Sequence, residues 1–121
     1  MNKRILMIED TEDNRQLIRD LLGSAGYELL EAVDGAAGVA MATKHKPDLI
    51  LMDIQLPIVD GYEATRRIKA DPALRHIPII AVTSYALSGD EAKARAVGCD
   101  GYVAKPFSPR QLLAKIQELL P

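Results

Sequence analysis

Charged and hydroxyl side chains follow short apolar runs at four places in the chain. They are, in chain order, Glu9-Asp10, Asp53, Thr83-Ser84 and Lys105-Pro106. Three carboxylates brought together repel one another, and a hard divalent cation such as Mg²⁺, which prefers carboxylate and water oxygens, relieves that repulsion. Such a metal site, joined by a hydroxyl, a lysine and an aspartate able to act as a nucleophile, has the parts needed for phosphoryl transfer.

The placement of Asp53 supports this chemistry. It stands inside the segment DLILMDIQLP, residues 48–57, with apolar neighbours on both sides. Burying an unpaired carboxylate costs several kcal/mol or forces the group to take up a proton. We therefore expect Asp53 to lie where a strand reaches a cleft, with Mg²⁺ and Lys105 close enough to balance its charge.

Five apolar runs alternate with segments of helical pattern. The runs are Arg4–Ile8, Tyr27–Ala32, Leu49–Met52, Ile77–Val82 and Gly101–Ala104. Near-continuous runs of Ile, Leu, Val and Met are typical of parallel strands covered on both faces, whereas the weaker second run predicts an edge strand. The alternation predicts an α/β fold, a doubly wound five-stranded parallel sheet of (βα)5 type, whose ligands bind beyond the carboxyl ends of the strands.

The segments between the runs predict five helices. The first two span Glu12–Ala25 and Gly35–His45, the second of them capped by Asp34. The next two follow capping residues at Asp60 and Ser88, and the last begins after Ser108. The first helix has an apolar stripe expected to face the sheet, made of Leu17, Ile18, Leu21, Leu22 and Ala25. The fourth has only three Ala and Val97 to bury, so we expect it to be the least anchored of the five.

Composition restricts the class of protein. The 121 residues are 48% hydrophobic and 26% charged, which fits one globular domain, and we expect residues 1–121 to form that domain as a complete protein. A single cysteine, Cys99, excludes an internal disulfide and suits the cytoplasm. The sequence has no apolar run long enough to span a membrane. Its net charge of −2 and dispersed basic residues argue against nucleic-acid binding.

The chain resembles the receiver domain of bacterial two-component response regulators (CheY-like) over essentially its full length. The matching motifs are Glu9-Asp10, Asp53 in LMDIQLP, Asp60-Gly61, Thr83 in AVTSYA, and Tyr102, Lys105 and Pro106 in YVAKPF. The segments EDTEDNRQL, DLILMDIQLP and GCDGYVAKP are most similar to small stand-alone receivers of the DivK type. The resemblance implies a flavodoxin-like sheet with strand order 2-1-3-4-5.

The resemblance also implies a role for each motif residue. Asp53 would accept a phosphoryl group from a histidine kinase or a histidine phosphotransfer protein, and Lys105 and Thr83 would contact the phosphoryl oxygens. The protein ligands of Mg²⁺ would be Glu9, Asp10, Asp53 and the backbone carbonyl of Gln55. The chain would assist its own phosphorylation and dephosphorylation as a phosphoacceptor, without being an enzyme that turns over a substrate.

The same resemblance implies a conformational switch. The Thr83 hydroxyl would move toward the phosphoryl group and Tyr102 would turn inward, which changes the surface of the fourth helix, fifth strand and fifth helix. That surface would bind a downstream protein target, with the chain monomeric or forming a phosphorylation-linked dimer. The Lys105-Pro106 peptide bond would be cis, and the bulky Tyr85 predicts slow dephosphorylation because it hinders an attacking water.

Alternative functions remain open at this stage. A haloacid-dehalogenase-type enzyme also uses a strand-end Asp with Mg²⁺, but it needs an acid where Gln55 stands. A flavodoxin-like FMN carrier needs a glycine- and hydroxyl-rich first loop, where this chain has the acidic segment Glu9–Asp13. A pseudo-receiver that acts without phosphorylation is disfavoured by the intact signature residues, and a fragment of a larger regulator or hybrid kinase is a further alternative.

The exposed face of the first helix also has two interpretations. Arg15, Gln16 and Arg19 are expected to lie on that face. They are either solvated charges or part of the surface that docks the histidine-bearing partner.

Overall fold

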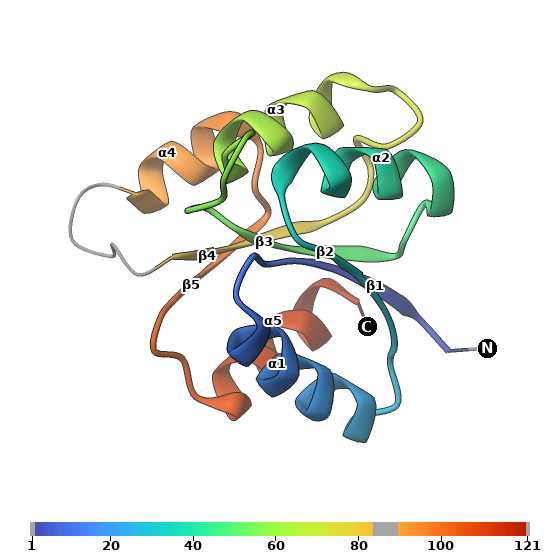
Figure 1. The fold of residues 1–121 in the computed structure, drawn as a ribbon, viewed down its shortest axis with the longest axis vertical. Coiled ribbons are helices and arrows are strands. Elements are labelled where there is room, and N and C mark those ends of the chain that lie inside the picture. Colours follow the sequence, from blue (N-terminus) through green and yellow to red (C-terminus); the bar gives the residue numbers. More distant parts are fainter. Residues whose placement is uncertain (1, 84–89, 121) are drawn as a thin grey trace.

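A parallel sheet lies between two layers of helices. The computed structural model describes residues 2–83 and 90–120 (Figure 1). The strands, in chain order, are β1 Arg4–Ile8, β2 Glu28–Ala32, β3 Leu49–Asp53, β4 Ile79–Thr83 and β5 Gly101–Ala104. Their order in the sheet is β2-β1-β3-β4-β5, and every pair is parallel. The predicted α/β fold and its strand order are confirmed.

Helices cover both faces of this sheet. They are α1 Glu12–Ser24, α2 Gly35–His45, α3 Gly61–Ala70, α4 Asp90–Val97 and α5 Pro109–Leu119. Figure 1 shows α2, α3 and α4 on one face, and α1 and α5 on the other. Because successive side chains of a strand point to opposite faces, Leu6 and Ile8 pack with the first group while Ile5 and Met7 pack with the second.

Burial along the strands follows their position in the sheet. The central strands β3 and β4 are buried throughout, and β1 is buried from Ile5 onward, whereas the edge strand β2 is mostly half-buried. The register pairs Asp53 of β3 with Val82 of β4, and Thr83 of β4 with Ala104 of β5. The carboxyl ends of these three strands are therefore level, which places their last side chains at one edge of the sheet.

Side-chain caps start three of the helices at the predicted residues. The Asp34 carboxylate accepts a hydrogen bond from the Ala37 N–H, and the Asp60 carboxylate accepts one from the Glu63 N–H. Ser108 opens α5 through a reciprocal capping box with Gln111. The box predicted at Ser88, and Tyr85, lie outside the described residues.

Helix α1 corrects one prediction. Leu17 was expected to face the core but is 57% exposed, while Ile18 and Leu22 are the buried residues of this helix. Ala25 of the same predicted stripe is also exposed, because α1 ends at Ser24. The reason is that the predicted apolar stripe is wider than the part of the helix that contacts the sheet. Gln16 is exposed as expected, whereas Arg15 and Arg19 are half-buried because both form ion pairs with Glu31 of β2.

Helix α4 has the thin packing that its composition predicts. Within Glu91–Val97, Ala94 is the one buried residue, and Val97 packs partly against the core. Among the described residues, no helix is both long enough and apolar enough to cross a membrane.

Candidate functional site

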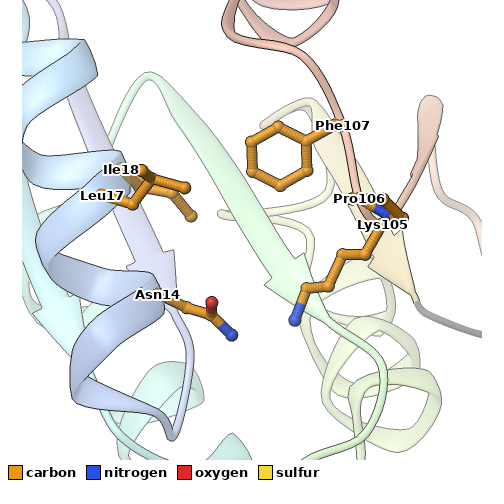
Figure 2. Close-up of a pocket in the computed structure, with 6 residues that line it drawn as sticks. All are labelled: Asn14, Leu17, Ile18, Lys105, Pro106 and Phe107. Carbon is orange, nitrogen blue, oxygen red and sulfur yellow. The ribbon is translucent and has the colours of Figure 1, made fainter.

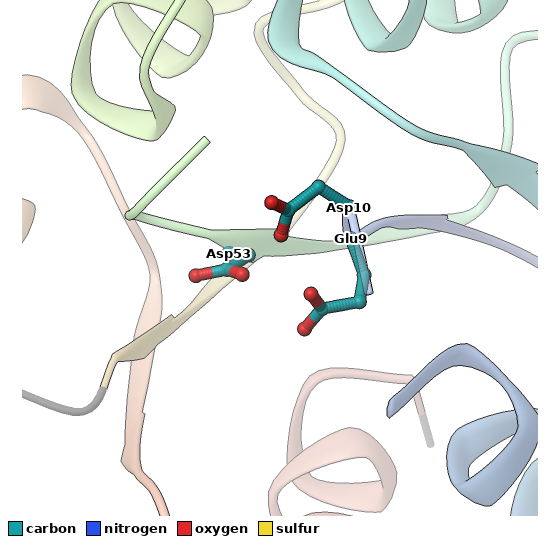
Figure 3. Close-up of side chains that lie close together, drawn as sticks. All are labelled: Glu9, Asp10 and Asp53. Carbon is teal, nitrogen blue, oxygen red and sulfur yellow. The ribbon is translucent and has the colours of Figure 1, made fainter. Parts of the chain in front are cut away.

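Four strand ends meet at one edge of the sheet, as predicted. Glu9 and Asp10 follow β1, Asp53 ends β3, Thr83 ends β4, and Lys105 follows β5. Figure 3 shows the three carboxylates directed toward the same space. One oxygen from each of Glu9, Asp10 and Asp53 lies within 4.8 Å of the others. Glu9 and Asp53 are 2% and 4% exposed, whereas Asp10 is open to solvent.

Lys105 connects the two buried carboxylates. Its Nζ lies 3.0 Å from Glu9 Oε1 and 3.4 Å from Asp53 Oδ2, and the lysine side chain is 17% exposed. The Lys105-Pro106 peptide bond is cis, as the resemblance implied. The site therefore joins an acidic group from β1, one from β3 and a cation from the segment after β5.

Glu9 is held in place by the start of α1. The Thr11 N–H donates to Glu9 Oε2 at 3.1 Å, and Asn14 Nδ2 donates to Oε1 at 3.4 Å. The Arg15 guanidinium donates to the Glu9 backbone carbonyl at 2.9 Å. Asn14 and Arg15 thereby fix the side chain and the backbone of the first acidic residue.

Asp53 is linked to β4 through Gln55. The Gln55 N–H donates to Asp53 Oδ1 at 3.0 Å, and Gln55 Nε2 donates to the Thr83 hydroxyl at 2.6 Å. Thr83 is fully buried. The Gln55 side chain thus spans the distance between the loop after the expected phosphoacceptor and the expected switch threonine.

The surroundings shift the pKa values of the two buried acids in opposite directions. Burial raises the pKa of Asp53 to about 6, with the nearby Glu9 charge adding to the effect and Lys105 opposing it. Burial alone would also raise the pKa of Glu9, but hydrogen bonds from Lys105 and the Thr11 N–H bring it below its usual value. Burial lowers the pKa of Lys105, and its bonds to Glu9 and Asp53 overcome that and raise it.

The carboxylates fit a hard divalent cation. Glu9, Asp10 and Asp53 offer only oxygen ligands, and their mutual repulsion is reduced by a cation placed among them. Asp10 faces solvent, so water molecules have access to complete a coordination shell. This donor set matches Mg²⁺, which retains several waters, better than it matches metals that prefer nitrogen or sulfur ligands.

Gly61 explains the Asp60-Gly61 motif in physical terms. Its N–H donates to the Ile54 carbonyl at 3.1 Å, which brings the start of α3 against the end of β3. A Cβ at residue 61 would lie 2.4 Å from the Asp53 carbonyl oxygen and 2.7 Å from the Ile54 Cα. Only a residue without a side chain permits this approach, so Gly61 helps to set the backbone position of Asp53.

The Gly61→Ala substitution is expected to lower the free energy of unfolding by about 1–3 kcal/mol, because backbone atoms must move to admit the methyl group. The matched control is Gly23→Ala on α1, where an added Cβ meets nothing within 4 Å. That change should be neutral or stabilising by about 0.5 kcal/mol. Urea unfolding of both variants measures the effect, and equal stabilities would contradict the role assigned to Gly61.

Tyr102 of β5 lies with its hydroxyl buried. Its ring packs against the same core cluster as residues of α3 and α4. The Tyr102 side chain is therefore directed inward in this structure, and the expected coupling of its movement to that of Thr83 stays a prediction.

A groove of about 440 Å³ lies beside the acidic site, between α1 and the segment after β5. Figure 2 shows its lining, which consists of Asn14, Leu17, Ile18, Lys105, Pro106 and Phe107. Asn14 and Phe107 were not among the predicted site residues. An amide in the first helical turn after Glu9-Asp10, and an aromatic ring directly after Lys105-Pro106, were the signals in the sequence.

The fold and the site together define a class of protein, the doubly wound α/β proteins with an acidic, lysine-bearing site at the carboxyl ends of the strands. Residues 5–117 match the response regulator receiver domain, and the chain belongs to that family of signalling proteins.

Particular relatives are similar over nearly the whole chain. A polar-differentiation response regulator DivK from Brucella anthropi is 46% identical, with 99% of this chain and 98% of the relative covered. The receiver domain of a sensor histidine kinase from Pseudomonas aeruginosa, solved with a magnesium ion coordinated in the active site cleft, is 39% identical with a TM-score of 0.93, covering 99% and 98% of the two chains. Vibrio cholerae chemotaxis protein CheY4 is 29% identical with a TM-score of 0.92, covering 98% and 99%.

Proposed function

We propose that the chain is a single-domain response regulator, in which Asp53 accepts a phosphoryl group from a phosphohistidine of a histidine kinase or a histidine phosphotransfer protein. The position of Asp53 carries the proposal. Its carboxylate is buried at the end of a central strand, within 3.4 Å of the Lys105 ammonium and close to the carboxylates of Glu9 and Asp10. A nucleophile, a cation and a metal-binding acidic pair are thereby combined in one site.

The transfer is a displacement at phosphorus. A carboxylate oxygen of Asp53 attacks, the P–N bond of the phosphohistidine breaks, and the electron pair of that bond returns to the imidazole nitrogen. Lys105 balances charge on the phosphoryl oxygens and the Thr83 hydroxyl donates to one of them.

The residues that would hold Mg²⁺ are Glu9, Asp10, Asp53 and the Gln55 backbone carbonyl. When bound, the metal supplies positive charge against the phosphoryl oxygens. The magnesium ion in the Pseudomonas receiver supports this assignment.

The groove beside the site suits the phosphodonor. It presents the apolar side chains of Leu17, Ile18 and Phe107 next to Lys105, so a partner helix packed there would hold its histidine near Asp53. Exposure of Leu17, an apolar residue that the core does not need, agrees with this use. Gln16 of α1 is exposed beside Leu17 in the chain, whereas Arg15 and Arg19 of the same helix are engaged with Glu31 of β2.

A second surface suits a downstream protein. The face of α4, β5 and α5 carries Tyr102, and a hollow there is lined by Tyr102, Val103, Ala104, Pro106, Gln111, Ala114, Lys115 and Glu118. We assign the downstream protein target to this face. Residues 1–121 would act as one receiver domain in the cytoplasm, as a monomer or a phosphorylation-linked dimer.

Incubation with Mg²⁺ and acetyl phosphate, followed by intact mass measurement, tests the proposal. The wild type is expected to gain one phosphoryl group, and Asp53→Ala is expected to gain none because the nucleophile is absent. Asp20→Ala, which removes an exposed aspartate of α1, should gain one group like the wild type. A folded wild-type protein whose mass does not change would favour a pseudo-receiver instead.

A further inference from the structure

The side chain of Gln55 forms a direct link between the phosphoacceptor loop and Thr83. Its Nε2 donates to Thr83 Oγ1 at 2.6 Å, slightly shorter than is usual for an N–H···O hydrogen bond. The two residues are 28 positions apart in the chain and belong to different strand ends. The contact exists because the register places the end of β3 beside the end of β4.

The backbone at both ends of this link is fixed. The Gln55 N–H is bound to Asp53 Oδ1 at 3.0 Å, and the Thr83 carbonyl accepts from the Lys105 N–H at 2.7 Å. Thr83 is fully buried in β4. A displacement of the Thr83 hydroxyl toward Asp53 therefore requires side-chain rotation, and a change of rotamer gives up the Oγ1 position in which the 2.6 Å bond from Gln55 is made.

We propose that the Gln55 side chain is a latch, a positioning residue that holds the Thr83 hydroxyl away from Asp53 and is released when a phosphoryl group draws that hydroxyl in. The inference rests on the proposed function, since it concerns the regulation of the same site. A transition that takes the Thr83 hydroxyl out of reach of Gln55 Nε2 breaks this hydrogen bond. A bond of ordinary strength then biases the equilibrium against the switched state by a factor of about five.

Binding of a phosphoryl analogue, beryllium trifluoride with Mg²⁺, tests the latch in four proteins. They are the wild type, Gln55→Met, Thr83→Val and the double variant. Met is close to Gln in length but cannot donate, and Val keeps the shape of Thr without the hydroxyl. Gln55→Met is expected to bind the analogue about fivefold more tightly than the wild type, because less is lost on switching. In the Thr83→Val background the same change should alter affinity less than twofold, because the latch has nothing to hold.

A second measurement tests the contact itself without the analogue. Each single variant loses the same hydrogen bond, so their effects on thermal unfolding should not add. The decrease in melting temperature of the double variant should be about 4 °C smaller than the sum of the decreases of the two single variants. Additive losses would overturn the inference, as would an equal change in analogue affinity in both backgrounds or weaker binding by Gln55→Met. A wild-type protein that binds no analogue contradicts the proposed function. Wild-type binding that is matched in affinity by Gln55→Met contradicts the latch alone.

Discussion

Replacing Lys105 with Met is expected to lower the unfolding free energy of the metal-free protein at pH 7 by about 3–5 kcal/mol. The ammonium group lies 3.0 Å from Glu9 and 3.4 Å from Asp53, and both carboxylates are almost fully buried. Removal of the cation leaves two like charges together in a site that solvent barely reaches. Urea unfolding in the presence of EDTA measures the loss.

Lys115→Met provides the matched control for this variant. Lys115 pairs with Glu118 on the exposed surface of α5, where an ion pair contributes less than about 1 kcal/mol. Added Mg²⁺ should raise the melting temperature of Lys105→Met more than that of the wild type, because a metal bound only by the native state stabilises it and here replaces the missing charge. Equal losses for the two lysine variants would show that Lys105 carries no special electrostatic role. A wild-type melting temperature that does not respond to Mg²⁺ would argue against the metal site.

Replacing Asp53 with Asn is expected to have the opposite effect and stabilise the metal-free protein at pH 7. The pKa of Asp53 is raised from 3.8 to about 6, chiefly by burial and by the charge of Glu9. A shift of this size corresponds to up to about 3 kcal/mol of native-state stability lost when the group ionises. Asn keeps the shape of the side chain and removes the charge.

The sign of the pH dependence follows from the same shift. Between pH 3.8 and about 6 the native state retains a proton on Asp53 that the unfolded state has lost, so stability falls as pH rises through this window. The contribution of Glu9 to the pH dependence has the opposite sign. Its pKa is lowered in the native state, so it adds stability that is lost only as pH falls below the ordinary pKa of 4.5. Unfolding in EDTA from pH 4.5 to 7.5 should therefore show a decline that Asp53→Asn lacks.

Glu63→Gln is the control for the pH series. The pKa of Glu63 is lowered by Arg67 and Arg66 on the surface of α3, so the loss of this carboxylate leaves the Asp53 effect in place. The decline between pH 4.5 and 7.5 should persist in this variant. If the stability of Asp53→Asn declined by as much as that of the wild type, Asp53 would not be the buried acid that destabilises the native state when it ionises.

The sequence predicts this fold well because its signals are local. The apolar runs, the caps at Asp34, Asp60 and Ser108, and the alternation of strand and helix each depend on neighbouring residues, and the structure confirms them. The convergence of Glu9 and Asp53 also follows, because parallel strands bring their carboxyl ends to one edge. The burial of Leu17 was predicted wrongly, because its apolar side chain does not indicate how far the sheet extends beneath α1.

Contacts that depend on register and loop conformation could not be predicted. The bond from Gln55 to Thr83 requires the pairing of Asp53 with Val82, which the residue types alone do not specify. The need for glycine at residue 61 is visible only once α3 is seen against the carbonyl of Asp53. The groove likewise forms from α1 and Phe107, which are distant in sequence and neighbours only in the folded chain.

The bond between Lys105 and Glu9 has a consequence for biosynthesis. It joins residues 96 positions apart, so the acidic pocket gains its cation only after nearly the whole chain has left the ribosome and β5 has paired with β4. A nascent or truncated chain that ends before residue 105 has the Asp53 carboxylate without the lysine that balances its charge. The ion pairs of the site are therefore completed only with the segment that follows the last strand.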